Sequence, residues 1–353
     1  MENFIRQEFY NREKELEDIN NILRAQPTLI TFIYGPINSG KTELINHLIK
    51  NLPDNYKVFY INLRGRFIKE YEDFIKVLFD IEYKERFKRI KEFLKPLIKT
   101  IPESYHGIPI PKDIFLQFFE KKEVEDAFVY IETVLKGFFE SGFIPVFILD
   151  ELQVIGDIKI DDLLIYKLFN FFVRLTKELH LSNVFAITSD SLFIENIYNE
   201  AMLQGRCRYI LVDDFSRETT FSFLDKYGFN EKEKEIAWHY CGGKPVCLVE
   251  LIRTKSELKK KAKEMLKIRV SQIRNLLNEL RLRNIEFGGQ SIKKEDVLEI
   301  FERFRDKDYV EYEEVDYAEL FLVKKNVLFM DPANSVIKPQ SKLDLLAIRS
   351  VIA

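Results

Sequence analysis

A short run near the amino terminus combines glycine, lysine and threonine in an order that suits the binding of phosphate groups. The pattern G-x-x-x-x-G-K-[ST] is matched at every fixed position by Gly35-Pro36-Ile37-Asn38-Ser39-Gly40-Lys41-Thr42. The glycines let the backbone turn so that successive N–H groups point inward at phosphate oxygens. Lys41 supplies a charge for the β- and γ-phosphates, and the Thr42 hydroxyl can ligate Mg²⁺. The sequence therefore predicts a phosphate cradle from Gly35 through Glu43.

The segments on either side of this run have the context that a phosphate cradle needs. A short β-rich stretch, "LITFIY" (29–34), ends at Gly35. The following "TELINHLIKNL" (42–52) repeats leucine and isoleucine at helical spacing. The alternative is a chance match in an ordinary strand-to-helix turn, and the surrounding strand and helix make it the weaker interpretation.

A second pair of chemically capable residues follows another apolar strand. Residues 146–149 are apolar on both faces, as in a central parallel strand, and Asp150 and Glu151 stand at the carboxyl end, the edge where open α/β sheets bind ligands. We expect Asp150 to hold a metal through water and Glu151 to orient and deprotonate an attacking water. Alone, such a pair is more often a solvated turn. Joined to the cradle, it predicts a hydrolytic site.

Two further candidates are less specific. Ser189 lies at the end of the fourth predicted strand and could hydrogen-bond the γ-phosphate or the lytic water, although this segment also fits a helix N-cap. Arg206 precedes the fifth predicted strand and could reach nucleotide held by a neighbouring subunit or domain. A surface salt bridge is the alternative for Arg206, and the sequence leaves action in cis or in trans open.

These candidates need a parallel sheet that brings the carboxyl ends of several strands together. Strands are predicted at 29–34, 57–65, 146–149, 183–191 and 207–215. Helices are predicted at 42–52, 67–100, 122–140 and 163–179, and the proline-bearing segment 100–113 is predicted as a loop. Alternation of strand and helix over about 210 residues indicates an α/β fold whose parallel sheet is covered on both faces.

Beyond residue 215 the pattern changes to short helices, a long basic helix over 255–286, another helix at 292–304, and two β-like pieces around a turn. Helices followed by a hairpin are typical of a winged-helix domain, although other small α+β modules share that order. We therefore predict three domains: a P-loop core over 1–215, a helical lid over 216–285 and a winged-helix-like domain over 286–353.

The composition excludes several classes of protein. A chain of 353 residues with 46% hydrophobic and 31% charged residues is typical of a globular protein and excludes wholesale disorder. A net charge of −3 provides no chain-wide attraction for nucleic acid, so any basic surface must be local. The three cysteines lack metal-site spacing. Because no signal region or membrane-length apolar run is visible, we expect a cytoplasmic protein without membrane contact.

Together these stretches resemble the archaeal ATPase family, a branch of the STAND-type, AAA-plus-related P-loop proteins. The resemblance covers most of the chain and is carried by "FYNREKEL", "GPINSGKT", "VFILDE" with Gln153, "TSDSLF", "GRCRYILVDDF" and "CGGKPVCLVEL". The cradle and "LDE", which correspond to the Walker A and Walker B motifs, are its most specific parts. The resemblance implies ATP as the nucleotide and Mg²⁺ as the metal, held by Thr42 and Asp150.

The resemblance also implies roles that residue types alone would not assign. It implies that Asn11 and Arg12 lie beside the adenine, whereas their types fit an ordinary helix start. The run Gly242-Gly243-Lys244-Pro245 is similar to a lid motif that contacts nucleotide, so Pro245 becomes a candidate nucleotide contact. The alternative is a helix-breaking turn. Lys244 would take the sensor role that arginine fills in many relatives.

The resulting hypothesis is an ATP-binding and ATP-hydrolysing switch whose lid closes on ATP and moves the C-terminal domain. The sequence does not decide which partner the C-terminal domain binds. Double-stranded DNA is favoured by the basic helix, with ten lysines and arginines against four glutamates, although its leucines indicate a core face and the acidic segment 305–320 would repel phosphate. The alternative is a STAND-type signalling or assembly ATPase that acts on a protein partner and forms an ATP-dependent oligomer.

Overall fold

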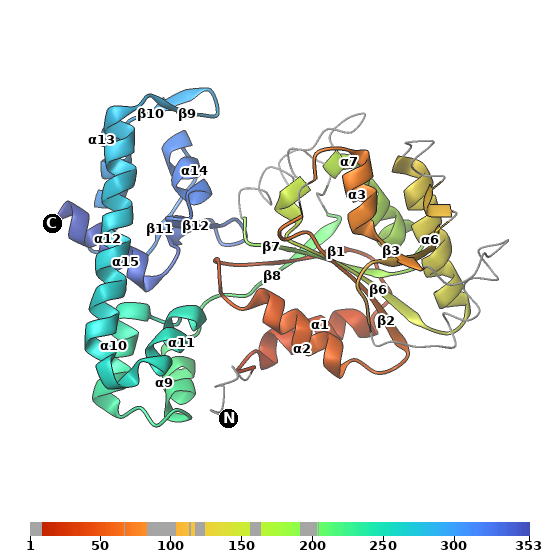
Figure 1. The fold of residues 1–353 in the computed structure, drawn as a ribbon, viewed down its shortest axis with the longest axis horizontal. Helices are drawn as coiled ribbons and strands as arrows, with labels where there is room; N and C mark the ends of the chain where they lie inside the picture. The colour runs from red at the N-terminus through yellow and green to blue at the C-terminus, as the bar shows by residue number, and fades with distance from the viewer. Residues whose placement is uncertain are drawn as a thin grey trace.

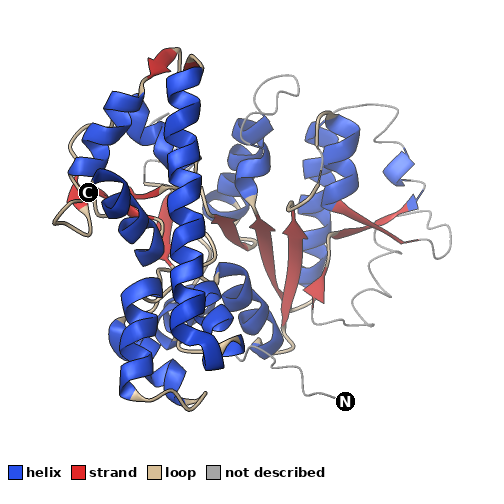
Figure 2. Cartoon of the chain, turned by 60° about the vertical axis from the view of Figure 1, so that its left-hand side comes forward, coloured by secondary structure: helices blue, strands red, loops and turns tan. Residues whose placement is uncertain are grey.

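A parallel sheet with its helices forms one half of the molecule, and helices with short hairpins form the other (Figure 1 and Figure 2). The structure is a computed structural model. It describes residues 9–66, 68–82, 104–112, 114–116, 124–155, 164–190, 203 and 205–353. Among the helices in these ranges, none is both long enough and apolar enough to cross a bilayer.

The central sheet has six strands in the order β4-β2-β6-β7-β1-β8, and all neighbouring pairs are parallel. The bounds are β1 Ile30–Tyr34, β2 Tyr56–Asn62, β4 Ser104–Tyr105, β6 Ile144–Asp150, β7 Asn183–Thr188 and β8 Cys207–Leu211. Asn62 is level with Asp150, and Tyr34 is level with Thr188. The carboxyl ends of β2, β6, β7 and β1 therefore meet at one edge, and the predicted α/β fold is confirmed.

Alternation along the strands explains why helices cover both faces of the sheet. Phe32 faces a buried apolar cluster with the helices α3, α6 and α7, and the next residue, Ile33, faces another cluster with α1 and α2. Figure 1 shows these two helical layers above and below the sheet. The bounds are α1 Glu13–Arg24, α2 Lys41–Asn51, α3 Tyr71–Leu78, α6 Val124–Glu140 and α7 Leu164–Val173.

The segment between β2 and α6 differs from the prediction. The sequence predicts one helix over 67–100, but the described residues of this range form the short helix α3 and then the strand β3 (Phe79–Glu82). Residues 83–103 lie outside the described part of the chain. The alternation of apolar and acidic residues in "FDIE" is a strand pattern. The expected loop contains β4 and β5 (Ile108–Pro111), and β5 pairs in parallel with β3. The prolines of β5 predicted a loop, because proline is tolerated in a sheet only at edge positions and argues against a strand elsewhere.

The helical half begins with a small bundle in the region that the sequence predicts to be a lid. Its helices are α9 Arg217–Asp225, α10 Glu231–Cys241 and α11 Pro245–Arg253. Asn230 and Glu233 form a reciprocal capping box that fixes the start of α10. The long helix α12 (Leu258–Leu282) follows a 3₁₀ turn, and its first residues, Leu258 and Ala262, are buried in the core of this bundle.

The far end of α12 belongs to a different core, because Ile273, Leu277 and Leu280 pack with the C-terminal elements. The bounds of those elements are β9 Ile285–Phe287, β10 Gln290–Ile292, α13 Lys294–Glu302, β11 Val310–Glu311, α14 Tyr317–Lys324, β12 Leu328–Asp331, β13 Val336–Pro339 and α15 Lys342–Ile352. The basic helix was predicted to reach residue 286, but it ends at Leu282 and is followed by the hairpin β9–β10. Gly288-Gly289, with positive φ at both residues, is the turn that makes this hairpin.

Candidate functional site

The phosphate cradle lies at the carboxyl end of β1, where it leads directly into α2. Gly40 caps α2 with a φ of 101°, and Asn38 has a φ of 60°, so the loop uses left-handed backbone at two places. Only residues without a bulky Cβ substituent, or with a short polar side chain, adopt this region readily. The turn that the glycine pattern predicted is therefore formed as expected.

Gly35 at the entrance of the cradle has no room for a side chain. A Cβ atom there would lie 2.2 Å from the backbone oxygen of Val212, and the φ of 154° is itself unfavourable for other residues. We expect Gly35→Ala to lower the free energy of unfolding by about 1–3 kcal/mol, because backbone must shift to admit the methyl group. Thermal unfolding followed by circular dichroism measures this.

Gly65→Ala is the matched control, because Gly65 also has a positive φ but nothing lies within 4 Å of the point that a Cβ atom there would occupy. That variant should be destabilised only by the left-handed backbone that its Cβ atom disfavours, by about 1 kcal/mol. Equal melting temperatures for the two variants would show that the contact with Val212 does not restrict Gly35.

Lys41 is buried in the cradle and already donates to it. Its ammonium lies 3.0 Å from the Gly35 oxygen and 2.9 Å from the Pro36 oxygen. Burial, with a smaller effect of nearby Lys244, lowers the pKa of Lys41 to about 8. The hydroxyl of Ser39 is also buried and has no hydrogen-bond partner among the described residues. A buried cation beside an unpartnered hydroxyl and a turning backbone fits a phosphate group.

The metal candidates Thr42 and Asp150 face one another. The Thr42 hydroxyl lies 3.2 Å from Oδ2 of Asp150, which also accepts a hydrogen bond of 2.8 Å from the Tyr60 hydroxyl. The N–H of Glu151 donates to Oδ1 of Asp150 at 2.9 Å. Burial raises the pKa of Asp150, and these hydrogen bonds oppose that shift. Hydroxyl and carboxylate oxygens are donors that suit Mg²⁺.

Glu151 is held from two sides. The Arg64 Nε donates to its Oε1 at 3.0 Å, and the side-chain amide of Gln153 donates to its Oε2 at 2.6 Å. Gln153 in turn accepts a 2.7 Å hydrogen bond from Thr188 and lies 3.4 Å from the Ser189 hydroxyl. The ends of β6 and β7 are thus joined around the carboxylate that we expect to activate water.

A cavity connects Glu151 with the cradle and with the C-terminal domain. It is lined from the core by Ile37, Asn38, Arg64, Glu151, Gln153, Ser189 and Asp190, and from α14 and the turn after it by Val323, Lys324 and Asn326. The predicted site residues Ser189 and Glu151 therefore share one chamber with the outer end of the cradle. A γ-phosphate placed there would lie between the two domains.

The other end of the cradle opens onto an aromatic cavity against the lid. The cavity is lined by Phe9, Tyr10, Arg12, Ser39, Gly40, Glu43, Phe215, Phe223, Pro245 and Val249. Apolar rings beside a phosphate site are suited to a nucleotide base. The predicted contacts Pro245, Glu43 and Arg12 are brought together in this cavity.

Arg12 links the cradle to the segment that leaves β8. Its guanidinium donates to the backbone oxygens of Ser39 and Asp213, each at 2.7 Å, and lies over the Phe215 ring. Asn11, by contrast, donates to the Thr219 hydroxyl of the lid at 2.6 Å. Arg12 therefore lies in the wall of the aromatic cavity and Asn11 contacts the lid, and their place beside an adenine stays a prediction.

The lid motif reaches the cradle through Lys244. Its ammonium donates to the Ile37 oxygen at 3.0 Å and pairs with Asp214 at 2.9 Å. A Cβ atom on the preceding Gly243 would lie 1.8 Å from the Phe215 oxygen, so this close approach between lid and hinge requires glycine. Lys244 therefore contacts the loop that would carry phosphate.

Arg206 is not part of this constellation. It precedes β8, and its backbone oxygen accepts a 3.0 Å hydrogen bond from Ile30 at the start of β1. Since β1 and β8 are parallel, Arg206 lies at the amino edge of the sheet and the cradle lies at the carboxyl edge. Its backbone therefore lies at the opposite edge of the sheet from the cradle of its own chain, and action on a neighbouring subunit stays a prediction.

Several residues of the site were not predicted from the sequence. Tyr60 and Arg64 lie at the end of β2, and the rule that ligands bind at the carboxyl edge of an open sheet applies to β2 as it does to β6. Gln153 has no local signal of its own and belongs only to the segment that carries the family resemblance. Two more come from the C-terminal domain: Lys324 lines the cavity beside Glu151, and Gln340 accepts a 3.1 Å hydrogen bond from the N–H of Ile37 in the cradle. No local pattern indicated either position.

The parallel sheet, the phosphate cradle and the acidic pair at its edge define a P-loop ATPase fold. Residues 9–251 match a family described as an ATPase domain predominantly from Archaea, and residues 259–352 match a C-terminal domain described as that of MJ1010-like uncharacterized ATP-binding proteins. The chain therefore belongs to this archaeal ATPase family, and the resemblance seen in the sequence is confirmed.

Individual relatives agree over nearly the whole length. An uncharacterized ATP-binding protein of Pyrococcus abyssi is 46% identical over 344 residues, which are 98% of each chain. One from Methanocaldococcus jannaschii is 46% identical over 358 residues, covering 98% of this chain and 97% of the other. A solved Walker-type ATPase of Pyrococcus abyssi shares the fold with a TM-score of 0.64 at 16% identity, covering 98% of this chain and 99% of its own.

Proposed function

We propose that this protein binds ATP with Mg²⁺, hydrolyses it, and couples the nucleotide to the position of its C-terminal domain. The observation that carries the proposal is the meeting of Lys41, the Thr42–Asp150 pair and Glu151 at one edge of the sheet. These are the charges that in-line attack of water on a γ-phosphate requires.

Each residue has a separate part in that reaction. Lys41 and the loop amides bind the phosphate oxygens and stabilise their charge. Thr42 and Asp150 would hold Mg²⁺, which supplies further charge neutralisation at the phosphates. Glu151 orients the water and accepts its proton. Arg64 and Gln153 hold the carboxylate of Glu151, and Gln153 ties it to β7.

Coupling is supported by contacts between the C-terminal domain and the carboxyl edge of the sheet. The hydroxyl of Tyr34, the residue before Gly35, donates to Asp331 at 2.6 Å. Lys338 pairs with Asp213, and Lys324 pairs with Asp190 at 3.4 Å. A shift of the cradle on nucleotide binding would change the Tyr34–Asp331 contact first, because Tyr34 directly precedes Gly35. A P-loop core, a helical lid and a C-terminal domain, which we predict to divide near residues 215 and 285, are the parts that would move. The helix α12 joins the last two, because its first residues pack with the lid and its far end packs with the C-terminal domain.

We propose double-stranded DNA as the partner of the C-terminal domain. Lys263, Lys267 and Arg274 line one groove along α12, together with Ser271 of that helix and Ser350 of α15. No ion pair of these three cations occurs within the described part of the chain. The sheet order β11-β13-β12, with α14 leading into the β12–β13 hairpin, supports a winged-helix-like arrangement. Unpaired cations in a row are suited to a phosphate backbone.

Replacing the three groove cations by glutamine is expected to weaken duplex binding most at low salt. If all three contact phosphates, the slope of log affinity against log salt should become about 2.7 less steep. Fluorescence anisotropy of a labelled duplex at several salt concentrations measures this. The control is Lys260→Gln with Lys261→Gln on the same helix, because those side chains are paired with Glu257 and Glu250. Equal slopes for the two variants would show that DNA does not bind in this groove.

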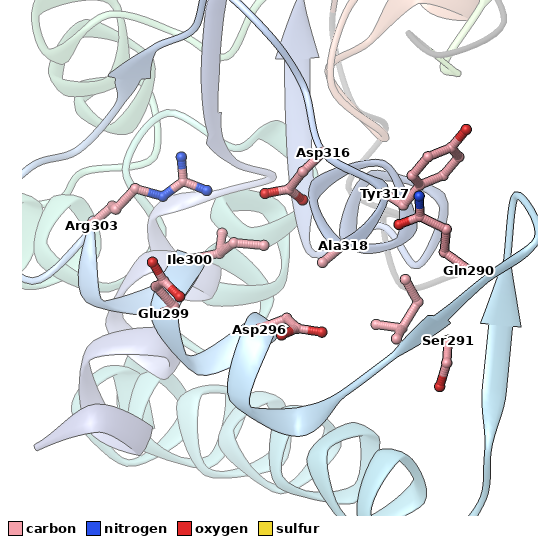
Figure 3. Close-up of a pocket in the computed structure, with 10 residues that line it drawn as sticks. Gln290, Ser291, Asp296, Glu299, Ile300, Arg303, Asp316, Tyr317 and Ala318 are labelled. Atoms are coloured by element: carbon pink, nitrogen blue, oxygen red, sulfur yellow. The ribbon is translucent and has the colours of Figure 1, made fainter.

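A protein partner is the second candidate, and the surface around α13 and α14 favours it. Figure 3 shows Asp296, Glu299 and Asp316 around one cavity, with Arg303 at its side. Carboxylates repel a phosphate backbone, so DNA would not approach from this side. ATP-dependent oligomerisation that is insensitive to salt, without duplex binding, would identify the protein as an assembly ATPase of this second kind.

A further inference from the structure

The cradle receives a hydrogen bond acceptor from the C-terminal domain. The backbone N–H of Ile37 donates to Oε1 of Gln340 at 3.1 Å. The amide nitrogen of the same side chain donates to the Leu328 oxygen at 3.0 Å. Gln340 directly follows β13, and it is only 3% exposed. Both ends of the Gln340 amide are therefore satisfied, which fixes its oxygen against the phosphate-binding loop.

Ile37 is the one described cradle residue that the structure joins to both the lid and the C-terminal domain. Its N–H is bonded to Gln340, and its oxygen accepts from Lys244 of the lid at 3.0 Å. Ile37 also lines the chamber that contains Glu151. A movement of Ile37 therefore alters contacts with both the lid and the C-terminal domain.

We infer that Gln340 is an internal competitor for the nucleotide: its amide oxygen takes the place of a phosphate oxygen at the Ile37 N–H. A backbone N–H directs one hydrogen atom, so a terminal phosphate that uses this donor must displace Gln340. Displacement breaks the hydrogen bond that anchors the end of β13 to the cradle, and the C-terminal domain shifts because one of its contacts with the core is lost. This inference rests on the proposed ATP site and adds the residue by which the site controls the domain.

The two substitutions at this position have opposite expected effects. Gln340→Ala removes the competing acceptor, and since one neutral hydrogen bond is involved, ATP affinity should rise roughly 2- to 10-fold. Gln340→Glu keeps an acceptor and makes its bond to the N–H charge-assisted, while it places a negative charge next to the phosphates. ATP affinity should then fall by about 10-fold or more.

The test is equilibrium titration of the full-length chain with a fluorescent ATP analogue and Mg²⁺. A second readout is energy transfer between a donor on the core and an acceptor on the C-terminal domain. In Gln340→Ala the ligand-free signal should already lie near that of the ATP-bound wild type. Gln290→Ala is the control, because Gln290 is an exposed glutamine in the hairpin β9–β10 of the same domain.

The outcomes separate the inference from the function on which it rests. A wild type that binds no nucleotide contradicts the proposed ATP site itself. A wild type that binds, with Gln340→Ala binding equally or more weakly, contradicts the competition. If Gln340→Ala fails to fold by circular dichroism, Gln340→Glu decides alone, and wild-type affinity in that variant overturns the inference.

Discussion

Lys41→Ala is expected to lower ATP affinity by about 100-fold and to abolish measurable turnover. Each charge-assisted hydrogen bond to a phosphate contributes about 1.5–3 kcal/mol, and alanine removes every one that Lys41 can make. The buried position of Lys41 increases the effect, because water screens little of its charge there. Titration with a fluorescent ATP analogue measures the affinity, and released phosphate measures the turnover.

Lys50→Ala is the matched control for this change, because Lys50 lies on the same helix α2 and is exposed. It should bind ATP like the wild type. Lys41 also bonds to two backbone oxygens of the cradle, so Lys41→Met, which keeps the apolar stem, separates loss of charge from loss of packing. Wild-type affinity in both Lys41 variants would show that phosphates do not bind at this loop.

Glu151→Gln is expected to reduce turnover by about 100- to 10,000-fold and to leave ATP affinity within a few-fold of the wild type. A positioned general base typically contributes a factor of this size, and the glutamine amide cannot accept the proton. The substitution keeps the shape of the side chain, so the cradle and the Thr42–Asp150 pair are preserved. Single-turnover phosphate release beside equilibrium binding measures both quantities, with and without duplex DNA.

Glu140→Gln serves as the control, since Glu140 is an exposed residue at the end of α6. Turnover in the Glu151 variant that equals the wild type would remove Glu151 from the reaction. A rate that changes on addition of duplex in the wild type supports DNA coupling, whereas a rate indifferent to DNA favours the protein partner.

The cradle and the acidic pair could be predicted because each is a local signal. Gly35, Lys41 and Thr42 lie in one short continuous segment of the sequence. Asp150 and Glu151 directly follow a clear apolar run that predicts a strand. Their adjacency follows from the rule that parallel strands expose their carboxyl ends at one edge. The parallel sheet, the cradle and the acidic pair could therefore be predicted from the sequence.

Other members of the site are brought together by contacts between segments far apart in the sequence, and sequence periodicity does not predict such contacts. Arg64 meets Glu151 because β2 lies beside β6, although the two strands are far apart in the chain. Gln340 meets Ile37 across 303 positions, through packing of a whole domain. The pair β3–β5 was missed for a different reason: prolines and acidic residues gave it the composition of a loop and a charged helix.

The helix α12 is built into two cores at once, with Leu258 and Ala262 in the lid and Ile273, Leu277 and Leu280 in the C-terminal domain. A helix of 25 residues is stiff and about 37 Å long. Tilting the lid by about 10° would therefore sweep the far end of this helix through roughly 6 Å. If nucleotide binding tilts the lid, as the proposed coupling requires, this helix would act as a lever arm: small adjustments around a phosphate would become displacements as large as a side chain at the far end of α12.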